Sequence, residues 1–212
     1  MKNLKFIFAL SLLICTLASC SETEEAQEFD NWKVRNVEYI DSIAGVARAN
    51  ADGNWKVFLA TGLDENKEWS NDYYVYCHVM QAGNGTSHPL YTDSVLVNYC
   101  GRLIPTSNHS EGLIFDSSYD GELNPDFDVP VKFLLNATVE GFSTALQHMV
   151  AGTTRTNGDI WRVYIPYTLG YGTTDFSGIP AYSTLVFDIN LVDFTPAGVP
   201  FKDHSAKNIT DL

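Results

Sequence analysis

Short β-branched and aromatic runs, interrupted by glycine and proline, dominate the sequence beyond Gly62. Residues of this kind favour strands, and glycine and proline mark the turns between them. The pattern therefore predicts four strand segments, residues 72–81, 94–103, 159–165 and 183–194. A single strong helical pattern lies among them at residues 141–150, whose apolar side chains share one helix face. Several strands around one short helix predict an α+β domain with an antiparallel sheet.

The composition limits the classes of partner. The 212 residues are 45% hydrophobic and 18% charged, which excludes a chain that is disordered throughout. Acidic residues number 26 and basic residues 13, for a formal net charge of −13. Because binding along a nucleic-acid backbone needs a basic face, we expect no nucleic-acid partner.

Residues 1–19 have the architecture of a secretory signal. A basic start precedes an apolar run from Phe6 to Leu17, which is too short to span a bilayer. The sequence Leu17-Ala18-Ser19-Cys20 resembles the bacterial lipobox, which implies that Cys20 is lipidated. We therefore expect an exported protein, anchored by Cys20 to a membrane of the bacterial cell envelope on its periplasmic or surface face. Cleavage nearby by an ordinary signal peptidase, without an anchor, is the alternative.

Three segments lie between the signal and the strands, or after them. Residues 20–28 are an acidic tether with nothing to bury, and residues 196–212 are a C-terminal tail. Residues 29–70 form an N-terminal extension that is partly helical, because apolar residues recur at helical spacing over residues 29–50. The apolar face of that helix packs either on its own domain or on a second copy, which would make a homodimer.

The cysteines leave one question open. Cys15 belongs to the signal segment and Cys20 is the expected lipidation residue, so Cys77 and Cys100 remain for the folded part. Two cysteines in an oxidising compartment can form a disulfide, and the residues alone do not decide whether these two do.

Several metal and cofactor motifs are missing or incomplete. The five histidines are scattered singly and no two cysteines lie three apart, so nothing supports a zinc site. Gly83-Asn84-Gly85 lacks the third glycine of a dinucleotide-binding loop. Oxygen side chains alternate over residues 120–128 as in a calcium loop, but Pro125 interrupts them and Val131 stands where a bidentate Glu is needed. We expect no metal and no cofactor, and a solvated acidic loop over residues 120–128, with calcium as the alternative.

Seven short motifs occur in an order that is more specific than any one of them. They are Val97-Asn98-Tyr99-Cys100-Gly101-Arg102-Leu103, Gly112-Leu113-Ile114-Phe115-Asp116-Ser117-Ser118, Val139-Glu140-Gly141-Phe142, Ile165-Pro166, Tyr171-Gly172, Ile179-Pro180 and Thr184-Leu185-Val186-Phe187-Asp188. Over about residues 73–194 this order resembles the FKBP-type peptidyl-prolyl cis-trans isomerases. The resemblance implies an antiparallel twisted β-sheet of about five strands wrapped around one short α-helix, in a domain of residues 71–195. It also places Cys77 and Cys100 on strands separated by two others, so both thiols are expected to be free.

The resemblance further implies a pocket for a prolyl ring. The family's pocket, carried to the matching positions, gives Tyr99, Phe115 and Phe187 as walls, Phe142 as the floor, Asp116 and the Tyr171 hydroxyl as polar groups, the Val139 backbone N–H as a donor to a substrate carbonyl, and Ile179 as an apolar lip. Phe127 or Val131 completes the wall, and that choice stays open. Phe142 replaces the family's usual tryptophan, which removes an indole N–H and is expected to lower affinity for macrolide ligands.

The function that the resemblance implies is peptidyl-prolyl cis-trans isomerisation that assists the folding of exported or envelope proteins. Its clients would be polypeptides that contain proline. Because isomerisation makes and breaks no covalent bond, a dry aromatic pocket that suits the twisted amide is sufficient. A catalytically idle relative that uses the same cleft to bind a peptide or a glycan is the alternative.

Overall fold

The computed structural model describes residues 28–201. The predicted signal segment, Cys20 and the end of the C-terminal tail lie outside the described residues. Within residues 28–201, no helix has both the length and the apolar character needed to cross a membrane.

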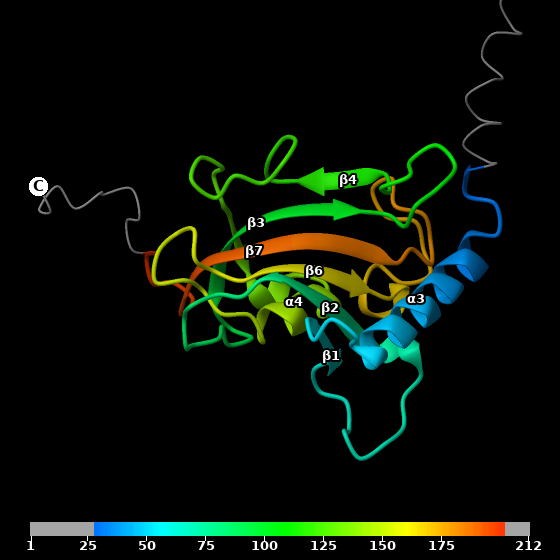
Figure 1. Cartoon of the computed structure of the whole chain (residues 1–212), viewed down its shortest axis with the longest axis horizontal. Coiled ribbons are helices and arrows are strands. Elements are labelled where there is room, and N and C mark those ends of the chain that lie inside the picture. The colour runs from blue at the N-terminus through cyan, green and yellow to red at the C-terminus, as the bar shows by residue number, and fades with distance from the viewer. Residues whose placement is uncertain (1–27, 202–212) are drawn as a thin grey trace, which may run out of the picture.

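Seven strands form one antiparallel sheet (Figure 1), rather than the five or so that the resemblance implied. The order is β1-β2-β6-β7-β3-β4, and β5 pairs with the part of β3 that β4 leaves free. The strands are β1 (Trp55–Leu59), β2 (Tyr74–Gln81), β3 (Ser94–Arg102), β4 (Ile114–Ser117), β5 (Val131–Leu134), β6 (Ile160–Ile165) and β7 (Leu185–Thr195). The helices are α3 (Trp32–Ala49) and α4 (Glu140–Leu146), with short 3-10 turns η1 (Asn71–Tyr73), η2 (Leu135–Ala137) and η3 (Tyr167–Leu169).

The four predicted strand segments are confirmed within two residues at each end as β2, β3, β6 and β7. The additional strands are shorter. β1 comes from the N-terminal extension and pairs with β2 from Trp55 opposite His78 to Leu59 opposite Tyr74, so the extension belongs to the sheet. The helix predicted over residues 141–150 ends earlier, at Leu146, because the N–H groups of His148 and Met149 donate to carbonyls three residues back, as in a tighter turn.

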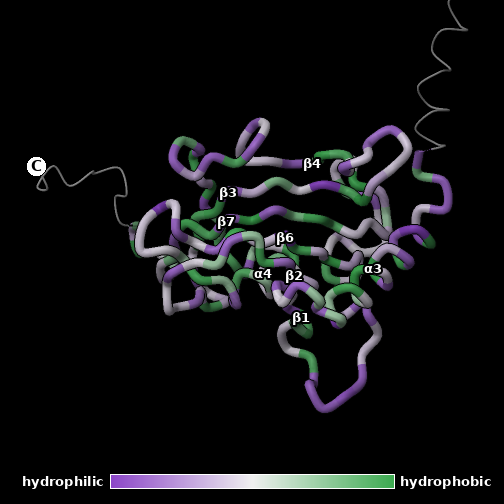
Figure 2. The backbone as a smooth tube through the Cα atoms, in the orientation of Figure 1, coloured by the Kyte–Doolittle hydropathy of each residue, from purple (hydrophilic) through white to green (hydrophobic). Residues whose placement is uncertain are grey.

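The two helices cover opposite faces of the sheet. Along β6, Val163 and Ile165 face the main core beside α4, whereas Tyr164 between them faces α3, as the alternation of a strand requires. Figure 2 shows the largely hydrophilic segment between β1 and β2. The main core is therefore the side of the sheet on which a site built around α4 would lie.

Helix α3 packs on the sheet of its own chain, which confirms the first of the two expected arrangements. Its buried Ile40, Ala44 and Ala47 form a cluster with side chains of β2, β6 and β7. At its start, Nε1 of Trp32 donates to Oγ of Ser183 at 2.8 Å, which ties the helix to the turn before β7. This part of the apolar face is covered within the chain, and a homodimer through the helix stays a prediction.

The two cysteines of the domain are buried and free, as the resemblance implied. Cys77 lies on β2 and Cys100 on β3, and β6 and β7 separate these strands in the sheet. Strands lie about 4.8 Å apart, so a gap of three strand spacings exceeds the reach of a disulfide.

Candidate active site

A cavity of about 270 Å³ lies on the α4 side of the sheet. Its lining comes from β3, β4, β5, β7, α4, the end of η2 and the loops that follow η2 and η3. It consists of Tyr99, Phe115, Asp116, Phe133, Ala137, Thr138, Val139, Phe142, Tyr171, Phe176 and Phe187. Seven of the nine residues that the resemblance assigned to the pocket are in this lining. The other two, Phe127 and Ile179, are not.

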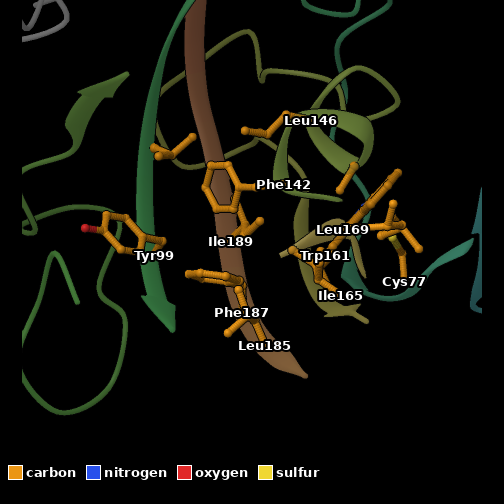
Figure 3. Close-up of a cluster of buried hydrophobic side chains, with 14 of the residues drawn as sticks. Cys77, Tyr99, Phe142, Leu146, Trp161, Ile165, Leu169, Leu185, Phe187 and Ile189 are labelled. Carbon is orange, nitrogen blue, oxygen red and sulfur yellow. The ribbon is translucent and has the colours of Figure 1, made fainter. Parts of the chain in front are cut away.

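The inner part of the cavity is an edge-to-face cluster of aromatic rings. Phe142 of α4 lies 5.1 Å from Phe187 and 6.4 Å from Tyr99, with interplanar angles of 70° and 81°. Phe115 meets Phe187 at 5.5 Å and 89°. Such offset and T-shaped contacts are the favoured geometry of aromatic pairs. Figure 3 shows Tyr99, Phe142 and Phe187 grouped beside β3 and β7, with the Tyr99 hydroxyl pointing away from the group.

Gly101 on β3 makes this ring arrangement sterically feasible. A Cβ atom at this position would lie 2.5 Å from Cε1 of Phe187 and 2.7 Å from Cζ of Phe115. Neither ring can retreat freely, because each packs against the other. The glycine that follows Tyr99 by two residues is therefore required by the walls of the cavity.

One polar pair lies at the mouth of the cavity. The Tyr99 hydroxyl donates to Oδ2 of Asp116 at 2.7 Å. Burial, and then the hydrogen bond to Asp116, raise the pKa of Tyr99 above its ordinary value. Asp116 is exposed, whereas Tyr99 is 7% exposed. The hydrogen bond therefore connects a buried ring of the cavity to a carboxylate at the protein surface.

The two serines after Asp116 hold β4 against β3 at this point. Oγ of Ser118 accepts a hydrogen bond from the Tyr99 N–H, and the Ser118 N–H donates to the Tyr99 carbonyl, both at 2.9 Å. Oγ of Ser117 donates to the same carbonyl at 3.2 Å. The Asp-Ser-Ser sequence thus fixes Asp116 relative to the tyrosine that binds it.

Two potential donors in the lining have no acceptor within residues 28–201. Val139 is the N-cap residue of α4, and its backbone N–H makes no hydrogen bond there. The Tyr171 hydroxyl also makes none, and burial, with a smaller effect of Asp116, raises the pKa of Tyr171. Both groups are therefore free to donate to a ligand in the cavity.

The structure corrects the assignment of the remaining wall. Phe127 is 81% exposed and Val131 37% exposed, and neither lines the cavity. The wall is Phe133 of β5, whose ring lies 5.5 Å from that of Tyr99. Phe133 pairs with Val95 across the sheet, so it shares the inner face with Tyr99, four residues further along β3. This strand parity was the signal that could have identified Phe133.

The structure also replaces Ile179 as the lip. Ile179 is 4% exposed and belongs to the main core, because its backbone pairs with Phe176 in a tight turn that points its side chain inward. The exposed partner in that turn, Phe176, stacks on Tyr171 with ring centroids 4.2 Å apart and planes at 11°. Phe176 therefore lines the cavity where Ile179 was expected.

No group of three or more His, Cys, Asp or Glu side chains in residues 28–201 is arranged to hold a metal ion. Residues 120–128 lie on an exposed loop, where Asp128 accepts a hydrogen bond from the Asn124 N–H at 2.6 Å.

Comparison with known proteins agrees with this geometry. FKBP-type peptidyl-prolyl cis-trans isomerase FkpA from Escherichia coli K12 is 38% identical over 120 residues, which cover 56% of this chain and 37% of that protein. Outer membrane protein MIP from Legionella longbeachae is 32% identical over 120 residues, which cover 56% of this chain and 43% of that protein. The chain thus spans less than half the length of either relative.

Similarity in structure extends further along the chain than similarity in sequence. The crystal structure of FkpA from Escherichia coli superposes with a TM-score of 0.53 at 26% identity, over 93% of this chain and 75% of that one. The family model for the FKBP-type peptidyl-prolyl cis-trans isomerases matches residues 85–192, about half of the chain, and this span holds the whole of the cavity lining. The chain belongs to the family of FKBP-type peptidyl-prolyl cis-trans isomerases.

Proposed function

We propose that this chain catalyses the cis–trans isomerisation of X-Pro bonds in exported or envelope polypeptides. The observation that carries the proposal is the 270 Å³ cavity with an aromatic interior, a polar pair at its mouth and two unused donors. Membership of the family supports it.

The chemistry needs little more than such a cavity. Rotation about an X-Pro bond has a barrier of roughly 18–20 kcal/mol, and a ten-thousand-fold acceleration requires a reduction of only about 5.4 kcal/mol. The planar amide is more polar than the twisted one, because twisting removes its resonance. An apolar pocket that excludes water therefore favours the twisted state relative to the planar one.

The lining supplies a distinct role for each part of the substrate. The rings of Phe142 and Phe187, 5% and 6% exposed, would contact the prolyl ring. The Val139 N–H and the Tyr171 hydroxyl would donate to substrate carbonyls, because both lack an acceptor within the described chain. Asp116, held by Tyr99, would orient the substrate at the mouth.

A protease-coupled isomerisation assay tests this function. The chain from Ser21 onward is assayed with a panel of peptides that vary the residue before proline, against the uncatalysed rate. We expect acceleration that depends on that residue. If no peptide in the panel is isomerised faster than without protein, while peptides still bind, the chain is a binding module and the catalytic proposal fails.

We also propose that Cys20 is lipidated and holds the protein at the cell envelope. The support is the Leu17-Ala18-Ser19-Cys20 sequence after an apolar run, together with the name of the Legionella relative, an outer membrane protein. Replacing Cys20 with Ser should release the protein from the membrane fraction or leave it unprocessed. Metabolic labelling that finds no acyl chain on the unaltered protein would contradict the proposal.

A further inference from the structure

A second, smaller cavity of about 70 Å³ lies on the other face of the sheet from the aromatic cavity. Tyr164, which faces α3, is in its lining, together with Tyr39 of α3, Arg102 of β3 and Arg162 of β6. Pro105 and Glu111 of the segment between β3 and β4 close one side. Two arginines therefore meet in one small space on a chain whose net charge is −13.

One carboxylate serves both arginines. Asp188 accepts hydrogen bonds from Nε of Arg162 at 2.6 Å and from Nη2 of Arg162 at 2.9 Å. Its Oδ2 also lies 3.4 Å from Nη2 of Arg102. A single carboxylate neutralises only one of the two guanidinium groups. Glu111 is exposed, so water screens its effect on the remaining positive charge.

Arg102 also has a hydrogen-bond donor, Nε, that is not satisfied by the described part of the protein. Its Nε is buried and has no hydrogen-bond partner in residues 28–201. The other side-chain contact of Arg102 is from Nη2 to Sγ of Cys100 at 3.3 Å. Buried polar groups without a partner are rare and costly, so an acceptor is expected at this position.

The tyrosine hydroxyls in the lining are donors across the physiological range. Burial raises the pKa of Tyr39 to about 12 and raises the pKa of Tyr164 as well. Their rings lie 6.3 Å apart. The cavity thus combines a surplus positive charge, a buried guanidinium N–H and neutral hydroxyl donors, all of which favour an oxyanion.

We propose that this cavity, lined by Tyr39, Arg102, Arg162 and Tyr164, binds a phosphate group. A water molecule occupies about 30 Å³ of liquid, so 70 Å³ has room for one small polyatomic anion but not for a nucleotide. The arginine geometry also suits phosphate, which guanidinium groups bind through several oxygens at once.

The place of the cavity leaves two sources for that phosphate. The segment between β3 and β4 that closes the cavity also contacts Glu28, the first residue that the structure describes. Nδ1 of His109 in this segment lies 2.7 Å from Oε1 of Glu28. Glu28 is eight residues from Cys20, so chain length limits Glu28 to within about 30 Å of a membrane anchored at Cys20. The phosphate is therefore either a soluble one or that of a phospholipid headgroup.

Binding of inorganic phosphate to the full chain tests the proposal. Isothermal titration with sodium phosphate is compared with sodium chloride at equal ionic strength, and the Arg102 Nε resonance is followed by NMR. We expect saturable phosphate binding and a shift of that resonance. Arg102→Gln should weaken binding about tenfold, and Tyr39→Phe, which keeps the ring and hence the fold, about threefold. The matched control is Arg48→Gln, which removes the same charge from an exposed position of α3 and should leave binding within about twofold.

Vesicles of phosphatidylcholine, which carry phosphate without net charge, distinguish the two sources. With Cys20→Ser in the full chain, vesicle binding that free phosphate competes away supports a lipid headgroup. Phosphate binding without vesicle binding supports a soluble ligand. The proposal is overturned if phosphate and chloride act alike, or if Arg48→Gln weakens binding as much as Arg102→Gln.

Discussion

The hydroxyl of Tyr99 and the carboxylate of Asp116 form a 2.7 Å hydrogen bond between neighbouring strands at the mouth of the aromatic cavity. The bond occupies Oδ2 of Asp116 and leaves Oδ1 without a hydrogen-bond partner among residues 28–201. The ring of Tyr99 is meanwhile fixed by Phe133 and Phe142. Asp116 is thus exposed but oriented, which is what a group that positions a flexible peptide requires.

Tyr99→Phe tests whether this orientation contributes to catalysis. The change keeps the ring contacts and removes only the hydroxyl, so kcat/KM should fall about tenfold, equivalent to about 1.4 kcal/mol. The midpoint of thermal unfolding should change little, because water can replace the hydroxyl at exposed Asp116. Tyr91→Phe, at a tyrosine that is 49% exposed and outside the cavity lining, is the control. A folded Tyr99→Phe variant with full kcat/KM would remove Asp116 from the mechanism.

The pH dependence follows from the tyrosines of the cavity. The pKa values of Tyr99 and Tyr171 are both raised, so each hydroxyl keeps its proton to higher pH than an ordinary tyrosine. No histidine is in the lining. Turnover should therefore vary by less than about twofold between pH 6 and 8, whereas a catalyst that relied on histidine would titrate in that range. A bell-shaped profile with a limb near pH 6.5 would contradict this account.

The long strands could be predicted from the sequence because each is marked by its own run of β-branched and aromatic residues. β3 and β7 are buried along most of their length, β6 is buried in large part and β2 is buried near its start, so their β-branched and aromatic runs are continuous. β4 and β5 are four residues each and largely exposed on one side. Each is a strand because β3 offers it an edge, and that depends on contacts distant in the sequence.

The same distinction separates the predicted site residues that line the cavity from those that do not. Phe115 and Asp116 lie in a motif whose glycine and serines fix its conformation, so the motif alone locates them. Phe127 lies in a loop whose course is set partly by Arg155, which donates to the carbonyls of Pro125 and Asp128. The sequence does not reveal that contact between distant residues, so Phe127 was predicted as part of the cavity wall although its side chain is exposed.

A pair of substitutions tests the corrected wall. Phe133→Ala removes a ring that contacts both Tyr99 and Phe142, so it should lower kcat/KM. It should also lower the free energy of unfolding by at most about 3–4 kcal/mol, because Phe133 is only half-buried. Phe127→Ala, at a ring that is 81% exposed, should change neither stability nor kcat/KM by more than about twofold for short peptides. The assay and urea unfolding measure both. Equal loss of activity in the two variants would restore Phe127 to the site.

Gly101→Ala should damage the cavity more than its single added methyl suggests. The new Cβ would lie 2.5 Å from a ring atom of Phe187, so one wall must move. Overpacking of this kind costs about 1–3 kcal/mol and should reduce kcat/KM with it. Gly45→Ala is the control, since nothing lies within 4 Å of the corresponding Cβ on α3. It should stabilise the protein by about 0.5–1 kcal/mol and leave kcat/KM unchanged. If Gly101→Ala is as active and stable as Gly45→Ala, the proposed packing constraint is wrong.

Low pH should weaken the contact between Glu28 and residues 106–109 of the segment between β3 and β4. The Glu28 carboxylate accepts hydrogen bonds from Oγ1 of Thr106, Nδ1 of His109 and Nδ2 of Asn108. Thr106, and then His109, lower the pKa of Glu28 below its ordinary value of 4.5. A pKa that is lowered by folding contributes stability that is fully present above 4.5 and is lost as pH falls through the folded-state value.

The free energy of unfolding should therefore respond to Glu28→Gln in a pH-dependent way. At pH 7 the variant should be less stable by about 1.5–3 kcal/mol, the range for hydrogen bonds to a charged group, and the difference should shrink toward zero as pH is lowered from 5 to 3. Urea unfolding at pH 7, 5, 4 and 3 measures it. Glu38→Gln, which removes the same charge from an exposed position of α3, should follow the unaltered protein at every pH. If the curves for Glu28→Gln and the unaltered protein stay parallel down to pH 3, the carboxylate of Glu28 is not what holds the segment before β4.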